Sequence, residues 1–212
     1  MAFVVFEGLD AAGKSTLIQG VNRLLQNRSQ KVVLTQDPGS TEIGQRLRDF
    51  ILSTKQSPPV PKAELLLYQA ARVQMVDQVI RPALQDKAWV LADRFYSSTL
   101  AFQVHGRGLN AQMVHQLNQY VSEGCRPDLF VFLDVTVEES QRRKQNRTKE
   151  SGVAQDRMEL ERSAFQEKVR QGYLTQAQES PQNWLVLDGQ QKPEKLCELV
   201  VQEFLERQWL AK

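Results

Sequence analysis

The residue types and spacing between Gly8 and Ser15 are those of a phosphate-binding loop. The stretch reads G-x-x-x-x-G-K-S, with a lysine and a serine directly after the second glycine. Glycines let a backbone curl until successive N–H groups point at one anion, and a following helix adds the positive end of its dipole. In such a loop Lys14 reaches the terminal phosphates of a nucleoside triphosphate, and the Ser15 hydroxyl binds Mg2+. We therefore predict a triphosphate site formed by Gly8, Leu9, Asp10, Ala11, Ala12, Gly13, Lys14, Ser15 and Thr16.

The segments on either side of this loop have the pattern that it needs. Residues 3–6 form a short apolar, β-branched run typical of a buried strand, and residues 15–26 carry apolar side chains at helical spacing. The alternative is a glycine-containing turn between a strand and a helix that binds nothing. The order strand, loop, helix favours the phosphate-binding interpretation.

The rest of the chain continues this alternation of strands and helices. Short apolar runs predict further strands at 31–35, 88–92, 129–133 and 184–187. Helical spacing predicts helices from about 41 onward and over 62–85, 97–104, 111–122, 158–176 and 193–209, with a kink near Pro82. Apolar strands that alternate with helices predict the α/β class, with a five-stranded parallel sheet flanked by helices on both faces, as in P-loop kinases. We expect residues 1–212 to form a single domain.

A polar pair, Asp93 and Arg94, stands where the third predicted strand ends. Ligands of open α/β sheets collect outside the carboxyl ends of the strands. Asp93 could act on Mg2+ through a water molecule, and the guanidinium of Arg94 could bridge phosphoryl oxygens. In isolation the pair could equally be a surface ion pair, but beside a phosphate-binding loop we favour a catalytic role.

A second basic group lies between residues 142 and 162, and it includes Arg143, Arg147 and Arg157. A solvated helix face is the usual explanation for such a group, and we keep it for about half of these residues. An enzyme that transfers phosphoryl groups must also neutralise charge and exclude water, which a mobile segment bearing arginines can do. Residues 145–155 lack apolar periodicity, so we predict a flexible lid at about 143–157.

Composition excludes several other classes of protein. The chain has 212 residues and a formal net charge of +2, without a basic stripe, so we expect no nucleic-acid partner. No apolar run is long enough to span a membrane, and no export signal precedes the first strand. The two cysteines lie far apart, which predicts reduced thiols and a cytoplasmic location. The two histidines form no zinc-binding cluster.

Five blocks of this sequence together resemble the thymidylate kinase family, and the resemblance spans nearly the whole chain. The block that begins at Asp93 and ends in Ala-Phe-Gln is the most discriminating. The blocks are Phe6 to Thr16, Asp37 to Thr41, Ala70 to Gln74, Asp93 to Gln103, and Arg126 to Leu129 with Leu133 to Val135. The resemblance implies transfer of the terminal phosphoryl group of ATP to thymidine monophosphate (dTMP), with Mg2+, by a homodimer in the synthesis of dTTP.

The resemblance also implies roles for individual residues. Lys14 and the loop amides would hold the ATP phosphates, and Arg94 would lie between donor and acceptor phosphates. Asp10 would face the sugar of the acceptor, Arg72 an edge of its base, and Phe102 would crowd the 2′ position. The acceptor site implied by the resemblance comprises Asp10, Asp37, Arg48, Tyr68, Arg72, Arg94, Ser98, Thr99, Phe102 and Gln103.

Two positions separate this chain from other members of that family. One branch carries an arginine inside the loop where this chain has Ala11, so the resemblance places the catalytic arginine in the lid. The candidates are Arg143, Arg147 and Arg157, and Arg157 best matches the lid's Asp-Arg-x-Glu pattern. Bacterial relatives usually carry Arg-Glu-Pro-Gly-Gly-Thr where this chain has Gln36 to Thr41, so the role of that arginine is open here.

Two other functions compete with this interpretation. One is a neighbouring P-loop kinase that acts on a different nucleotide or nucleoside. The other is a nucleotide-binding regulatory or scaffold protein that has kept the fold and lost turnover. The intact Lys14, Ser15, Asp93 and Arg94 argue against the second alternative.

Overall fold

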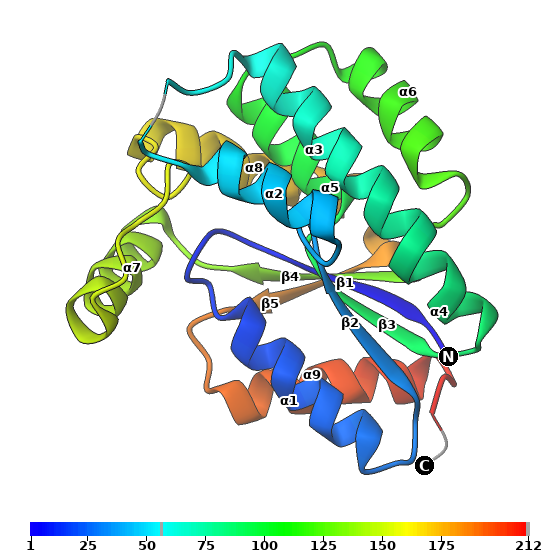
Figure 1. Ribbon diagram of the computed structural model, residues 1–212. Coiled ribbons are helices and arrows are strands. Elements are labelled where there is room, and N and C mark those ends of the chain that lie inside the picture. The colour runs from blue at the N-terminus through cyan, green and yellow to red at the C-terminus, as the bar shows by residue number, and fades with distance from the viewer. Residues whose placement is uncertain (56, 211–212) are drawn as a thin grey trace.

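A five-stranded, all-parallel sheet with strand order β2-β3-β1-β4-β5 forms the centre of the molecule (Figure 1). The computed structural model describes residues 1–55 and 57–210. The strands are β1 (Phe3–Glu7), β2 (Val32–Gln36), β3 (Trp89–Asp93), β4 (Leu129–Asp134) and β5 (Trp184–Asp188). The sequence-based prediction of an α/β fold with five parallel strands is confirmed.

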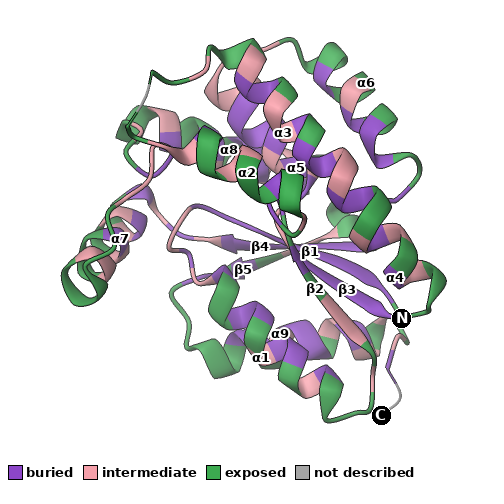
Figure 2. Cartoon of the chain, viewed as in Figure 1, coloured by how far each residue is buried: buried purple, intermediate pink, exposed green. Residues whose placement is uncertain are grey.

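The burial of the strands follows their composition. All five residues of β1 are buried, and β3 and β4 are buried up to their last residue, whereas the edge strands β2 and β5 are half exposed (Figure 2). Pairing of Phe6 with Asp93 and with Val131 brings the carboxyl ends of the three central strands to one edge of the sheet. The polar residues that end these strands therefore meet at the same place.

Helices cover both faces of the sheet (Figure 1). Helices α1 (Lys14–Gln26) and α9 (Pro193–Glu206) cover one face, where Val21 and Phe204 are fully buried. The opposite face carries α2 (Glu42–Leu52), α3 (Pro61–Met75), α4 (Arg81–Gln85), α5 (Tyr96–Thr99), α6 (Ala111–Ser122) and α8 (Ser163–Glu179). Helix α7 (Val137–Ser151) projects beyond the carboxyl ends of the strands. None of the helices in the described ranges is long and apolar enough to cross a membrane.

Two predicted helices contain π-helical turns that the sequence pattern did not reveal. The helix predicted over 62–85 runs through α3 and α4, joined by the π-helix η1 (Val76–Ile80) directly before Pro82. Proline has no N–H and its ring collides with a carbonyl one turn earlier, so a wider turn accommodates it. The helix predicted over 97–104 is α5 followed by the π-helix η2 (Leu100–Gly106). π-turns often mark functional sites, and η2 carries Phe102 and Gln103.

The segment predicted to be a flexible lid is helical in its first half. Residues 143–151 are the end of helix α7, and only residues 152–162 form a loop. Thr136 caps α7 by accepting a hydrogen bond from the Glu139 N–H, and Gly152 ends it with a φ of 69°. Ion pairs from Glu139 to Arg142 and Arg143 stabilise the helix without an apolar face. The helix predicted over 158–176 begins only at Ser163.

Candidate active site

A cavity of about 630 Å³ lies at the carboxyl edge of the sheet, between the phosphate loop, α2, α3, η2 and the loop after α7. Most residues expected from the sequence line it: Asp10, Ala11, Lys14, Ser15, Asp37, Arg48, Tyr68, Arg72, Asp93, Arg94, Ser98, Thr99, Phe102, Gln103 and Arg147. The others do not: Gly8, Leu9, Ala12, Gly13, Thr16, Arg143 and Arg157. The cavity thus joins the predicted donor and acceptor residues in one space.

The phosphate loop has the backbone geometry that its glycines permit. Gly8 and Gly13 adopt φ values of 144° and 107°, and a Cβ on Gly8 would come within 2.6 Å of the Leu133 carbonyl oxygen. The ammonium of Lys14 folds back over the loop and donates to the carbonyl oxygens of Gly8 (3.3 Å) and Leu9 (3.1 Å). Burial, reinforced by the charge of Arg94, lowers the pKa of Lys14. Burial thus disfavours the charged ammonium of Lys14, and a phosphate bound in the loop would stabilise it.

Ser15 and Asp93 present a pair of hard oxygen donors to the cavity. The Ser15 Oγ lies 3.5 Å from Asp93 Oδ2. Within residues 1–55 and 57–210, no three histidine, cysteine or acidic side chains gather into a metal cluster. This donor set suits Mg2+, because Mg2+ commonly takes one or two protein oxygens and completes its shell with waters and phosphate oxygens. The pair fits the magnesium role expected from the sequence.

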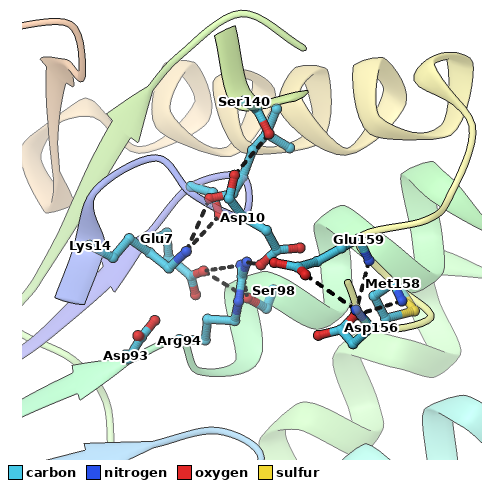
Figure 3. Close-up of polar contacts among 12 residues, drawn as sticks. Glu7, Asp10, Lys14, Asp93, Arg94, Ser98, Ser140, Asp156, Met158 and Glu159 are labelled. Atoms are coloured by element: carbon cyan, nitrogen blue, oxygen red, sulfur yellow. Dashed lines mark hydrogen bonds and ion pairs between the residues drawn. The ribbon is translucent and has the colours of Figure 1, made fainter. Parts of the chain in front are cut away.

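Arg94 is the central cation of the cavity. It adopts a φ of 72°, a left-handed conformation that is costly for a residue with a side chain. Its guanidinium donates to Asp10 Oδ1 at 2.7 Å (Figure 3) and to the Tyr173 hydroxyl at 2.9 Å. It lies 5.1 Å from the centroid of the Phe102 ring. Burial alone would lower the pKa of Arg94, but Asp10 and the nearby Glu7 raise it. Arg94 is thus a fixed positive charge beside the phosphate loop.

Asp10 is the carboxylate partner of this arginine. Burial would raise the pKa of Asp10, but the charges of Arg94 and Lys14 hold it below its usual value. The Ser140 Oγ of α7 donates to the backbone carbonyl of Asp10 (2.8 Å), which ties α7 to the phosphate loop (Figure 3).

Glu7 is a buried carboxylate that sequence reasoning did not single out. Its side chain is fully buried and accepts hydrogen bonds from the Phe95 N–H (3.1 Å), from Ser98 Oγ (2.7 Å) and from the Tyr173 hydroxyl (2.8 Å). One of its oxygens lies 3.6 Å from the Arg94 guanidinium. An acid that ends an apolar strand directly before the glycine loop was a usable signal, whereas nothing in the sequence pointed to Tyr173.

The acceptor side of the cavity is built around a buried ion pair. Arg72 is 1% exposed and donates through Nε to Asp37 Oδ2 at 2.5 Å. Burial raises the pKa of Asp37 in spite of this pair. Arg48 of α2 donates to the Pro38 carbonyl oxygen (2.9 Å). The two arginines on the acceptor side, Arg48 and Arg72, are therefore both held by the segment Asp37–Pro38. Gln36 also lines the cavity and brings no charge.

Uncharged side chains complete this wall. The Thr99 Oγ1 is buried without a hydrogen-bond partner in the described ranges. Phe102 is 7% exposed, and Gln103 donates through Nε2 to Glu64 (2.9 Å). Burial, with the nearby charge of Glu64, raises the pKa of Tyr68, so its hydroxyl stays neutral. These side chains give the acceptor half an apolar surface with few polar groups, as small-molecule sites commonly have.

The structure separates the three lid arginines that the sequence left as candidates. Arg143 donates to the carbonyl oxygens of Ala12 (3.0 Å) and Gly189 (2.9 Å), behind the phosphate loop. Arg147 lines the cavity, and its Nη2 donates to both carboxylate oxygens of Glu159 at 2.6 Å.

Arg157 lies outside the cavity, contrary to its place as the best match to the lid pattern. Its Nε donates to the Ile51 carbonyl oxygen (2.8 Å) and its Nη2 to Glu64 (2.7 Å). The buried carboxylate of Glu64 on α3 therefore binds the guanidinium that was expected to face the phosphates.

Two acidic residues of the lid also border the cavity, and neither was expected there. Asp156 Oδ1 accepts hydrogen bonds from the N–H groups of Met158 (2.8 Å) and Glu159 (3.0 Å), which forms a tight turn (Figure 3). This turn holds the Glu159 carboxylate against Arg147. Glu159 belongs to the same Asp-Arg-x-Glu pattern that drew attention to Arg157, so the sequence did contain a signal.

Comparison with known proteins gives the family of this chain. The model of the thymidylate kinase family matches residues 6–200. The chain is 46% identical over 210 residues to a thymidylate kinase of Bdellovibrio bacteriovorus, covering 99% of this chain and 98% of that protein. It is 41% identical over 203 residues to a thymidylate kinase of Kosmotoga olearia, covering 96% and 95% of the two chains. The chain belongs to the thymidylate kinase family.

Membership confirms the resemblance that the sequence blocks indicated. The chain is a nucleoside monophosphate kinase, a phosphotransferase whose family uses ATP as phosphoryl donor, and its relatives support phosphorylation of dTMP in nucleotide synthesis. Family membership assigns no role to an individual side chain, so the roles of the cavity residues are argued below from their geometry.

Proposed function

We propose that this cavity transfers the γ-phosphoryl group of ATP to dTMP, with Arg94 between the two nucleotides. The observation that carries the proposal is the continuity of the cavity. Lys14 and Ser15 of the phosphate loop line it at one end, Arg48 and Arg72 at the other, and Arg94 lies beside Asp10. Phosphoryl transfer needs little covalent participation from protein, so positioning and positive charge account for most of the catalysis.

Each end of the cavity has a distinct task in this proposal. The loop amides and Lys14 hold the ATP phosphates, while Asp10 orients the sugar of the acceptor. Ser15, with Asp93 through a water molecule, would hold Mg2+, which neutralises charge on the donor phosphates when it is bound. Arg147 is the lid arginine that we assign to the transferred group, because it alone of the three candidates lines the cavity.

A screen of acceptors tests this function directly. ADP release should be measured by a coupled assay with every nucleoside monophosphate and with thymidine, at saturating ATP and Mg2+. We expect dTMP to give the highest kcat/KM. If another acceptor exceeds dTMP by about tenfold or more, the dTMP assignment fails, and ATP binding without any transfer would identify a regulatory protein instead.

Replacing Phe102 by alanine should relax discrimination between deoxyribose and ribose. The ring is 7% exposed and lies beneath Arg94, where it would crowd a 2′-hydroxyl. We expect the ratio of kcat/KM for dTMP to that for the ribonucleotide to fall by about tenfold, as for other loosened apolar contacts. Phe102→Tyr keeps the ring and serves as the control. An unchanged ratio in Phe102→Ala would remove this residue from sugar selection.

We propose in addition that the protein is a homodimer that pairs through α2 and α3. These helices pack against each other and expose Ile43 (52% exposed) and Leu66 (57%) to solvent. Light scattering after gel filtration should give twice the chain mass for the unaltered protein and the single mass for Ile43→Lys/Leu66→Lys. Val186→Lys, on the equally exposed edge strand β5, is the matched control and should remain dimeric. If the unaltered protein shows the mass of a single chain, the homodimer proposal is contradicted.

We place the enzyme in the cytoplasm. Cys125 and Cys197 are both buried and both free thiols. Free thiols suit a reducing compartment, which is also where ATP is available.

A further inference from the structure

Glu64 is a buried carboxylate that does not line the cavity but binds a residue that does. It lies on α3 and is 1% exposed. Its Oε1 accepts hydrogen bonds from Gln103 Nε2 (2.9 Å) and Arg107 Nε (3.1 Å). Its Oε2 accepts from Arg107 Nη2 (3.0 Å) and Arg157 Nη2 (2.7 Å). Both oxygens are thus occupied by donors from η2, from the residue after η2, and from the lid.

The charge state of Glu64 follows from these contacts. Burial alone would raise its pKa, but hydrogen bonds from Arg107, Gln103 and Arg157 bring the pKa below its usual value. The group is therefore ionised at neutral pH. An ionised carboxylate only accepts hydrogen bonds, so it can bind the NH2 end of a glutamine amide but not the carbonyl end.

This restriction fixes the Gln103 side chain in one orientation. Because its NH2 group must face Glu64, its carbonyl oxygen is the atom left for a molecule in the cavity that Gln103 lines. Within the described ranges no donor occupies that carbonyl oxygen. A glutamine without such an anchor can rotate its amide and offer either a donor or an acceptor.

We propose that Glu64 is a positioning residue for base selection, which locks Gln103 so that it presents a hydrogen-bond acceptor to the acceptor base. Thymine and uracil carry a ring N3–H donor, whereas N3 of cytosine is an acceptor. The fixed Gln103 amide therefore favours a base with an imide N–H over cytosine. Arg107 and Arg157 hold the Glu64 carboxylate in position. This inference rests on the proposed function, because only a nucleotide acceptor in this cavity would bring a base to the wall that Gln103 lines.

The test compares three acceptors, dTMP, dUMP and dCMP, in the full-length enzyme. For Glu64→Gln we expect the kcat/KM ratio of dTMP to dCMP to fall by about tenfold, since a neutral amide can also donate to Gln103 and let it turn. The ratio of dTMP to dUMP should stay unchanged, because both bases offer the same N3–H. A residue that merely supports the fold would not separate these two ratios.

Two further variants guard against a folding defect. Glu64→Asp keeps the charge for both arginines but draws the carboxylate one methylene away from Gln103, and we expect the dTMP to dCMP ratio to fall by about threefold or more. Asp134→Asn removes one partner of the ion pair with Arg170, which lies outside the cavity, and should leave both ratios unchanged.

A double-mutant cycle supplies the last readout. If Glu64 acts through Gln103, then Gln103→Leu should abolish any additional effect of Glu64→Gln on the ratio. The inference is overturned if either Glu64 variant keeps the original dTMP to dCMP ratio, if the two effects add, or if Asp134→Asn shifts the ratio equally. An unaltered enzyme that does not prefer dTMP over dCMP would instead refute the proposed function itself.

Discussion

Replacing Arg94 by alanine is expected to lower kcat by about 10³-fold, with a much smaller change in KM for either nucleotide. The guanidinium is held between Asp10 and Tyr173, so it does not have to be ordered when the nucleotides bind. A charge fixed in advance costs no reorganisation as negative charge spreads over the transferred group. Steady-state kinetics with ATP and dTMP varied independently will give both parameters.

The variant Arg94→Lys separates charge from geometry. An ammonium keeps the positive charge but cannot bridge two phosphoryl oxygens as the guanidinium fork does, so we expect a loss of about 10²-fold in kcat. Arg170→Ala is the matched control, because Arg170 pairs with Asp134 through two hydrogen bonds but does not line the cavity. If Arg94→Ala kept its kcat within about threefold of the original value, Arg94 would have no role in the transition state.

The parts of the site that depend on local sequence were predictable. The glycines, Lys14 and Ser15 lie within one loop, and the strand before it is apolar over residues 3–6, so a single pattern fixed both the element and its chemistry. Asp93 and Arg94 were found in the same way, because parallel strands bring their carboxyl ends to one edge. In both cases the residues that form the site are neighbours in the sequence.

The parts that depend on distant partners were not predictable. The pairs Glu7–Tyr173 and Glu64–Arg157 join residues that are 166 and 93 positions apart. A sequence pattern shows which side chains can carry charge, but not which of several carboxylates will bind a given guanidinium. The same limit applies to α7, whose helix rests on ion pairs and a cap rather than on an apolar stripe.

The difference between local pattern and distant contacts leads to a prediction about Arg147 and Arg157. The pattern Asp-Arg-x-Glu pointed to Arg157. In the structure, however, Arg157 binds Glu64, whereas Arg147 lines the cavity. Arg147→Ala should therefore lower kcat by about 10²- to 10³-fold, with little change in KM, because the interaction is made mainly in the transition state. The same steady-state assay measures it.

The paired variant Arg157→Ala should behave differently. It should keep kcat within a few fold at a temperature where it is folded. Its unfolding free energy should fall by about 3 kcal/mol, because among the described residues the buried Glu64 then has only Arg107 as a cationic partner. For a chain of this size that corresponds to a Tm lower by about 6–12 °C, measured by calorimetry.

The two outcomes together decide which lid arginine acts on the phosphates. A large fall in kcat for Arg157→Ala with Arg147→Ala unaffected would mean that the lid rearranges on closure and exchanges the two side chains. Glu159 would then be the residue to replace next, because it holds Arg147 through both carboxylate oxygens. If Arg147 is the catalytic residue, its release from Glu159 must accompany the approach to the transition state, and Glu159→Gln should weaken that hold and raise kcat with little change in the KM for ATP.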